Sequence, residues 1–168
     1  MRDVHHFIGG KADLGPPTHW APVYDPNTGE VQGRVALGGA DEVDRAVQIA
    51  VRAQADWAAV NPQRRARVMF EFKRLVEARM DELAALLSSE HGKVLADSRG
   101  DIQRGLDVIE FACGIPHALK GEYTEGAGPG IDVYSMRQPL GVVAGITTPW
   151  FLAPPMACTR FPAAAPVA

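Results

Sequence analysis

A run of apolar residues near the C-terminal end constrains the fold of this chain more than any other feature. Residues 137–147 read Arg-Gln-Pro-Leu-Gly-Val-Val-Ala-Gly-Ile-Thr, and residues 140–146 within them are nearly continuous in apolar residues. Such a run is typical of a parallel strand that is covered on both faces. Because a buried strand needs neighbours to pair its backbone groups, the run predicts an α/β fold.

The residues after that strand cannot continue it. The segment 148–168 holds five prolines and six alanines among its 21 residues and shows no apolar period. Proline fixes φ and lacks an amide donor, so this segment can form neither a long helix nor a central strand. We therefore expect an α/β part over residues 1–147 and an irregular, divergent tail over 148–168. Since the chain offers one candidate core strand, we also expect the fold to be incomplete.

The first 39 residues have the pattern of short strands and turns. Phe7-Ile8 runs into Gly9-Gly10, and the residues Asp-Pro-Asn-Thr-Gly-Glu at 25–30 suit a tight turn. Val31 to Leu37 then alternate in the manner of a half-buried strand. This region predicts a β-hairpin appendage that precedes the helices.

Residues 41–115 have helical periodicity. Asn61 followed by Pro62 is the pattern of a helix N-cap and first position. Apolar residues repeat at helical spacing on either side of this pair. We expect one helix from residue 41, a second from 62 to about 79 that restarts and runs to 92, and a third over about 96–115.

The rest of the chain predicts a loop and two strands. Residues 116–130 contain glycine at 121, 126, 128 and 130, which favours a loop. Residues 131–138 alternate as a strand, and Pro139 separates them from the apolar run. An unpaired edge on the strand 131–138 would invite pairing with another chain.

Composition excludes several classes of function. The charge of −3 leaves no basic footprint for nucleic acid, and no apolar run is long enough to span a membrane. The N-terminus lacks the pattern of a leader, which predicts a cytoplasmic chain. Cys113 and Cys158 make no disulfide framework and no zinc spacing, so no metal site is expected.

Short motifs give the chain a resemblance to a known superfamily, the aldehyde dehydrogenases. The motifs that carry it are Phe7-Ile8-Gly9-Gly10-Lys11, Asp25-Pro26-Asn27-Thr28-Gly29-Glu30, Glu90-His91-Gly92-Lys93 and Pro139-Leu140-Gly141-Val142-Val143. Each is weak alone, but their order and spacing are those of the superfamily. Within it, residues 104–112 and 131–147 look like the CoA-acylating methylmalonate-semialdehyde dehydrogenases. The resemblance covers about residues 4–147.

The resemblance implies a reaction and its cofactors. The family oxidises methylmalonate or malonate semialdehyde with NAD and passes the acyl group to CoA, in valine and inositol catabolism. It implies an N-terminal part of an NAD-binding domain with a β-hairpin, three helices and two strands. It also implies assembly into homo-oligomers, and a fragment of this kind could associate with a full-length paralogue.

The sequence departs from the family where the catalytic turn should begin. The family continues with a Thr-Pro-Phe-Asn-Phe-Pro-like turn whose Asn helps form the oxyanion hole. Residues 147–154 instead read Thr-Thr-Pro-Trp-Phe-Leu-Ala-Pro, with one residue inserted and no Asn. The family's Cys nucleophile and general-base Glu would lie further along. We therefore expect an altered or out-of-frame ending, no catalytic residues and no activity from this chain alone.

Three residues are candidates for binding. By the resemblance, Arg104 is the clamp for the substrate carboxylate, which suits the fork of a guanidinium. The alternative is a surface arginine that pairs with Asp101 or Asp107, three residues away on the same helix. Thr147 and Trp150 occupy the positions that meet the nicotinamide ribose in the family.

Other reactive residues have structural explanations. Cys113 lies on the apolar face of its helix and is expected to be buried, and Cys158 stands in the tail without a base. His5 and His6 are adjacent and do not share a face, while His91 suits the end of a helix. The glycines of 126–130 do not open a helix, so they make no phosphate cradle.

Overall fold

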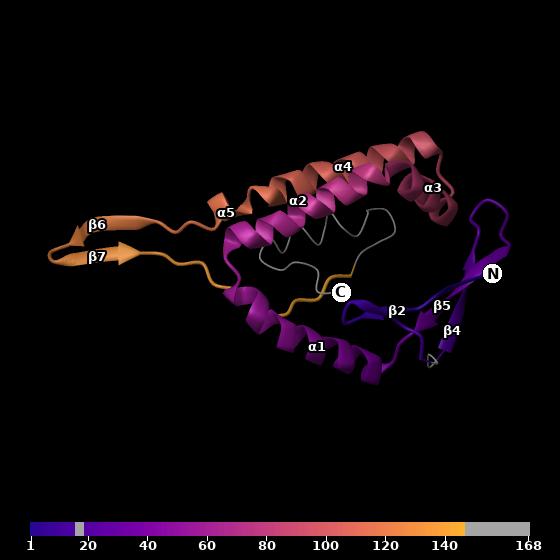
Figure 1. Cartoon of the computed structure of the whole chain (residues 1–168), viewed down its shortest axis with the longest axis horizontal. Helices are drawn as coiled ribbons and strands as arrows, with labels where there is room; N and C mark the ends of the chain where they lie inside the picture. Colours follow the sequence, from indigo (N-terminus) through magenta and orange to yellow (C-terminus); the bar gives the residue numbers. More distant parts are fainter. Residues whose placement is uncertain (16–18, 147–168) are drawn as a thin grey trace.

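The computed structural model describes residues 1–15 and 19–146 (Figure 1). The helices lie in the middle of the chain and the strands before and after them. In chain order the elements are β1 (Arg2–Val4), β2 (His6–Ile8), β3 (Lys11–Asp13), β4 (His19–Tyr24), β5 (Val31–Leu37), α1 (Ala40–Ala59), α2 (Pro62–Ala78), α3 (Met80–His91), α4 (Leu95–Cys113), α5 (Ile115–Ala118), β6 (Tyr123–Gly128) and β7 (Ile131–Tyr134). The expected α/β class with a hairpin ahead of the helices is confirmed.

The core lies where α2, α3 and α4 pack together. α4 runs alongside α2, with α3 at one end of the pair (Figure 1). The buried residues of this core are Val76, Ala84, Ile102, Leu106, Ile109 and Ala112. Ser98 is fully buried, and its hydroxyl lies 2.8 Å from that of Ser88, which joins α4 to α3. A buried hydroxyl with such a partner avoids the cost of an unsatisfied polar group.

Local signals set the ends of these helices. The Asn61 Oδ1 accepts from the Gln63 amide at 2.8 Å and caps α2 as expected. Gly92 ends α3 with a φ of 76°, and its amide donates to the Ser88 carbonyl at 2.8 Å. A left-handed residue at this position strongly favours glycine. The single residue Arg79 separates α2 from α3, so the expected restart is confirmed.

The N-terminal strands form two small sheets. β4 and β5 make an antiparallel hairpin around the turn at residues 25–30, and β2 pairs with β3. β1 adds to β5 in parallel, a pairing that the sequence does not predict. Gly33 permits it, because a Cβ there would lie 2.6 Å from the Arg2 carbonyl oxygen.

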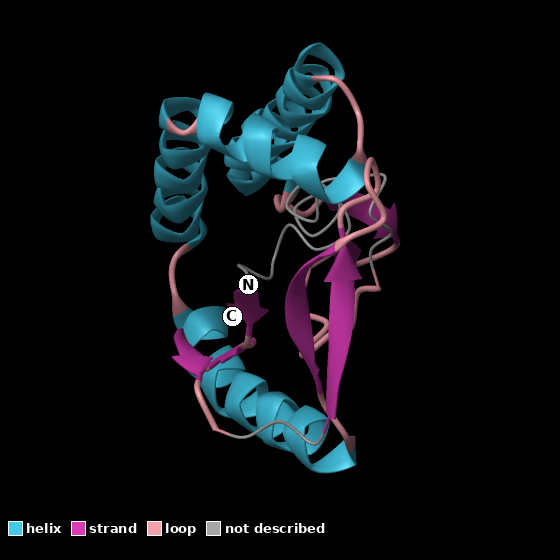
Figure 2. Cartoon of the chain, turned by 90° about the vertical axis from the view of Figure 1, so that its right-hand side faces the viewer, coloured by secondary structure: helices cyan, strands magenta, loops and turns pink. Residues whose placement is uncertain are grey.

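Helix α1 diverges from the α2–α4 layer. It starts near the N-terminal strands and meets α2 at its far end (Figures 1 and 2). None of its residues is buried. Val43, Val47 and Val51 repeat at four-residue intervals and are 60%, 40% and 50% exposed. Within the described residues, no helix of the chain is long and apolar enough to cross a membrane.

The C-terminal part of the described chain corrects two expectations. Residues 116–130 are not simply a loop, because α5 begins at Ile115 and β6 pairs with β7 as a hairpin. The strand expected over 131–138 ends at Tyr134. This hairpin projects from the helical layer, and both of its strands are largely exposed (Figure 1).

The buried strand expected at 140–146 is wrong for this structure. These residues form no strand, and Leu140 and Ile146 are 85% and 96% exposed. A parallel strand is stabilised by the strands beside it and the helices over it. None of the described strands pairs with residues 140–146. The apolar pattern alone cannot supply the backbone hydrogen bonds that a buried strand needs.

Candidate carboxylate site on helix α4

Arg104 projects from the outer face of α4. Ile102, Leu106 and Ile109 point into the core, whereas the Arg104 side chain is 73% exposed. Phe111 follows Arg104 by seven residues, which places it two turns on along the same face, and it is 70% exposed. The structure therefore presents a cation and an aromatic ring on one exposed face of α4.

The Arg104 guanidinium pairs with one of the two neighbouring acids. Its Nη1 donates to the Asp101 Oδ1 at 2.5 Å. Asp107 instead accepts from the Gln103 amide at 2.9 Å. Of the two alternatives left open by the sequence, a surface pair with Asp101 is present, and Arg104 has no other partner among the described residues. Only Nη1 is engaged, so the pair leaves donors of the fork for a ligand.

Asp101 is held by a second cation. The Lys93 Nζ donates to the other carboxylate oxygen, and the two side chains are only 20% and 17% exposed. The Lys93 hydrogen bond lowers the pKa of Asp101, and the charge of Arg104 lowers it further. Asp101 therefore stays ionised while it bridges two cations. The sequence motif contains Lys93, but Asp101 lies eight positions further along, and the pairing becomes visible only when the α3–α4 connection is folded.

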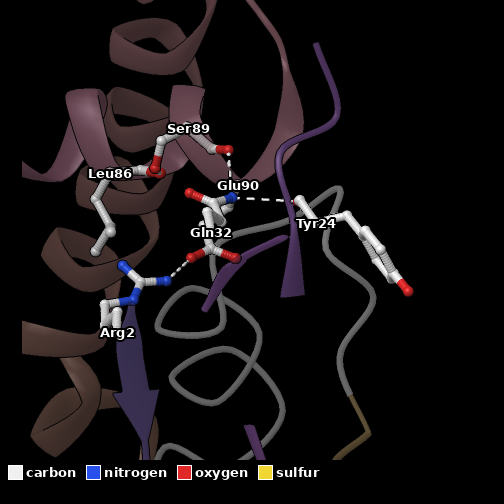
Figure 3. Close-up of polar contacts among 6 residues, drawn as sticks. All are labelled: Arg2, Tyr24, Gln32, Leu86, Ser89 and Glu90. Carbon is white, nitrogen blue, oxygen red and sulfur yellow. Dashed lines mark hydrogen bonds and ion pairs between the residues drawn. The ribbon is translucent and has the colours of Figure 1, made fainter. Parts of the chain in front are cut away.

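The N-terminal sheet fixes the end of α3 from which Lys93 extends. The Gln32 amide donates to the Ser89 carbonyl at 3.1 Å and to the Tyr24 carbonyl at 3.2 Å (Figure 3). Arg2 forms an ion pair with Glu90 beside it. At Gly92 a Cβ would lie 3.1 Å from the Pro26 Cγ, so the turn of the hairpin packs against this glycine.

Arg34 belongs to a separate cluster on the N-terminal sheet. Its guanidinium makes two hydrogen bonds of 2.8 Å to Asp3 and lies 4.3 Å above the Trp20 ring. The Asp3 hydrogen bond raises the pKa of Arg34, and the same bond lowers the pKa of Asp3. His5 meets the Trp20 ring edge-on at 5.3 Å. This cluster ties three strands together and leaves Arg34 engaged, so it is structural.

The one cysteine among the described residues is not a candidate nucleophile. Cys113 is buried, as predicted, and burial raises the pKa of its thiol, which disfavours the reactive thiolate. His91 is the last residue of α3, as predicted. Cys158, Thr147 and Trp150 lie outside the described residues. Among residues 1–15 and 19–146, no group of three or more His, Cys, Asp or Glu side chains could hold a metal ion.

Comparison with known proteins identifies related chains. The profile of the aldehyde dehydrogenase family matches residues 16–166, so the similarity extends beyond residue 147. A malonate-semialdehyde dehydrogenase of Pseudomonas aeruginosa is 42% identical over 149 residues, which are 88% of this chain and 29% of the relative. A human methylmalonate-semialdehyde/malonate-semialdehyde dehydrogenase is 38% identical over 143 residues, 85% of this chain and 27% of the relative.

Solved structures of similar chains belong to the same class of enzyme as these relatives. A structure described as a methylmalonate-semialdehyde dehydrogenase from Sinorhizobium meliloti complexed with NAD is 54% identical, with a TM-score of 0.80. The match covers 84% of this chain and 29% of that one. A second, from Oceanimonas doudoroffii, is 40% identical with a TM-score of 0.79. The chain thus spans about 29% of the length of the first relative and of the first structure.

Proposed function

The chain belongs to the aldehyde dehydrogenase family, and on this premise we propose that it serves the NAD-dependent, CoA-acylating oxidation of malonate or methylmalonate semialdehyde. The names of its relatives and the NAD-bound structure support this substrate class and cofactor. Arg104 carries the proposal within the chain itself, since it is an exposed guanidinium with donors left for a second carboxylate. Both substrates carry a carboxylate in addition to the aldehyde.

The role of Arg104 in this reaction is to bind and orient. A guanidinium fork matches a carboxylate in two parallel hydrogen bonds, which fixes direction as well as position. Phe111, on the same face, would cover the carbon chain of the ligand. These groups would hold the substrate but form no covalent bond to it. They therefore contribute to affinity and orientation, not to the chemical step.

The described residues do not fit the dinucleotide. The glycines of residues 126–130 belong to the β6–β7 hairpin, and as far as residue 146 no helix follows them to receive a phosphate. Thr147 and Trp150 stay predicted contacts of the nicotinamide ribose. NAD supplies hydride acceptance in this reaction class, and CoA would accept the acyl group. No step through either group is assigned to residues 1–15 and 19–146.

We propose that the 168-residue chain alone is inactive. The family chemistry needs a thiolate, oxyanion donors and a dinucleotide site together, and the described residues bring no such set into one place. An assay with malonate semialdehyde, NAD and CoA should give no NADH above background. Addition of NAD should leave the melting temperature unchanged, whereas a saturable rise would show that the chain binds it.

Substitution of Arg104 tests the carboxylate site. In an enzyme that carries this helix intact, Arg104→Ala should raise the KM for the semialdehyde acid at least about tenfold, because a charge-assisted hydrogen bond is worth roughly 1.5–3 kcal/mol. The KM for NAD should not change. Gln103→Ala, on the neighbouring exposed position, is the matched control. An unchanged KM for the semialdehyde would end the assignment.

A second candidate function is association through the β6–β7 hairpin. Ile131, Val133 and Tyr134 are 56%, 53% and 67% exposed on β7, and a two-stranded sheet has free edges. An intact aldehyde dehydrogenase subunit is the partner that we propose. Co-purification with a full-length paralogue should be lost in Val133→Lys and retained in Val47→Lys, which alters an exposed valine of α1 instead.

A further inference from the structure

A long side chain such as that of Arg104 does not point in one direction unless something holds it. Its guanidinium lies mostly in solvent, where many rotamers compete. A carboxylate ligand that needs two parallel hydrogen bonds would have to select one of them. Affinity therefore depends on any group that fixes the fork before the ligand arrives.

Asp101 is placed to be that group. It precedes Arg104 by three residues on α4, and its Oδ1 lies 2.5 Å from the Arg104 Nη1. The side chain of Asp101 is only 17% exposed, in contrast to 73% for Arg104. A carboxylate in a partly buried position is a fixed point to which the exposed guanidinium can attach.

Lys93 explains why Asp101 itself stays fixed. It holds the second oxygen, Oδ2, so the carboxylate cannot rotate without breaking an ion pair that is largely shielded from water. The backbone just before Lys93 is set by the left-handed Gly92 and by the contacts of Gln32 with the end of α3 (Figure 3). The support thus reaches from the N-terminal sheet to the acid.

The geometry leaves the useful side of the fork open. Asp101 takes Nη1, and Arg104 has no other partner among the described residues. The Nε and Nη2 donors form an edge of the guanidinium that can meet a carboxylate in the bidentate way. An acid that engaged this edge instead would block the ligand.

We propose that Asp101, anchored by Lys93, is a positioning residue that orients the Arg104 guanidinium with its Nε–Nη2 edge directed outward. The orienting role stands on the contacts of this chain. The identity of the ligand as the carboxylate of a semialdehyde acid rests on the proposed function.

Guanidinium NMR of the 168-residue chain tests the orienting role. Rotation about the Arg104 Nε–Cζ bond should be slow in the wild type and several-fold faster in Asp101→Asn, which keeps the shape and removes the charge. Asp101→Glu should restore much of the restriction, because an acid three residues away still reaches the guanidinium. Lys93→Met should give an intermediate rate, because it loosens the acid without removing it.

Asp107→Asn is the matched control. It removes an acid at the same distance along the helix that bonds Gln103 and not Arg104. The rotation rate should stay at the wild-type value in this variant. The proposal is overturned if Asp101→Asn rotates like the wild type, or if Asp107→Asn has an equal effect.

Titration with malonate separates the two claims. Malonate offers the carboxylate of the proposed substrate without the aldehyde. It should shift the Arg104 Nε resonance in the wild type but leave that of Arg52, an arginine of α1, unshifted. If no Arg104 shift occurs while rotation still follows Asp101, the substrate assignment fails and the orienting role stands. If the rotation rate does not depend on Asp101 while malonate still shifts the Arg104 resonance, the orienting role fails and the substrate assignment stands.

Discussion

Single residues in this chain do structural work that their type alone does not reveal. Arg104 and Arg34 are both exposed arginines with a carboxylate partner, yet their surroundings differ. Arg34 donates to Asp3 from both Nε and Nη2 and stacks on Trp20, so this edge of its guanidinium is already occupied. Arg104 gives one donor to an acid that Lys93 already shares. The number of donors left over separates a structural arginine from a candidate binding residue.

Gly92 is a residue whose backbone conformation decides its identity. An alanine there would adopt a left-handed φ and place its Cβ 3.1 Å from Pro26. We expect Gly92→Ala to lower the free energy of unfolding by about 1–2 kcal/mol, measured by urea titration. Gly100→Ala is the control, because Gly100 lies inside α4 with open space at its Cβ. It should stabilise the chain by up to about 1 kcal/mol.

The Lys93–Asp101 pair predicts a dependence of stability on pH. The pKa of Asp101 is lowered in the folded chain, chiefly by the Lys93 hydrogen bond. The pair therefore stabilises the fold fully above the unfolded value of about 3.9, and this contribution is lost as the pH falls through the lower, folded pKa. Asp101→Asn should cost stability near neutral pH and progressively less below about pH 4. In a Lys93→Met background the same substitution should cost much less near neutral pH, where the pair contributes most.

At the scale of elements, capping and packing together set where the helices begin and end. α2 begins where Asn61 caps it and ends where Arg79 separates it from α3. The sequence predicts these limits well, because caps are local interactions among neighbouring residues. The β6–β7 hairpin is less visible, since its glycines are typical of a loop as well as of a turn between strands.

The cap of α2 gives a prediction for an element. Asn61→Ala removes the oxygen that accepts from the Gln63 amide at 2.8 Å. The free energy of unfolding should fall by about 0.5–2 kcal/mol. Gln63→Ala, at an exposed position of the same turn, should change it by less than about 0.5 kcal/mol. Equal losses in both variants would show that the cap does not stabilise α2.

At the scale of the whole molecule, the apolar residues are unevenly used. The main apolar cluster lies among α2, α3 and α4, whereas α1 and the residues after β7 keep large apolar side chains exposed. Among the described residues, none of the valines of α1 and none of the residues 140–146 is buried. The stability of the chain must therefore come mostly from one three-helix cluster.

Core and surface substitutions test this division. Ile109→Ala removes a side chain that is 1% exposed, and it should cost about 2–5 kcal/mol of unfolding free energy. Val47→Ala removes one that is 40% exposed on α1, and it should cost less than about 0.5 kcal/mol. Thermal unfolding followed by circular dichroism measures both. A large loss in Val47→Ala would show that α1 is packed against another surface in solution.

The sequence by itself determined the four long helices, the Asn61 cap of α2, the N-terminal hairpin and the family of the chain, because each depends on short-range patterns or ordered motifs. Only the tertiary structure decided which acid Arg104 pairs with, because Lys93 reaches Asp101 from another element. It also decided that β1 joins β5 and that residues 140–146 form no strand. A strand and a shared ion pair both depend on partners distant in sequence, and local periodicity contains no information about whether those partners are in place.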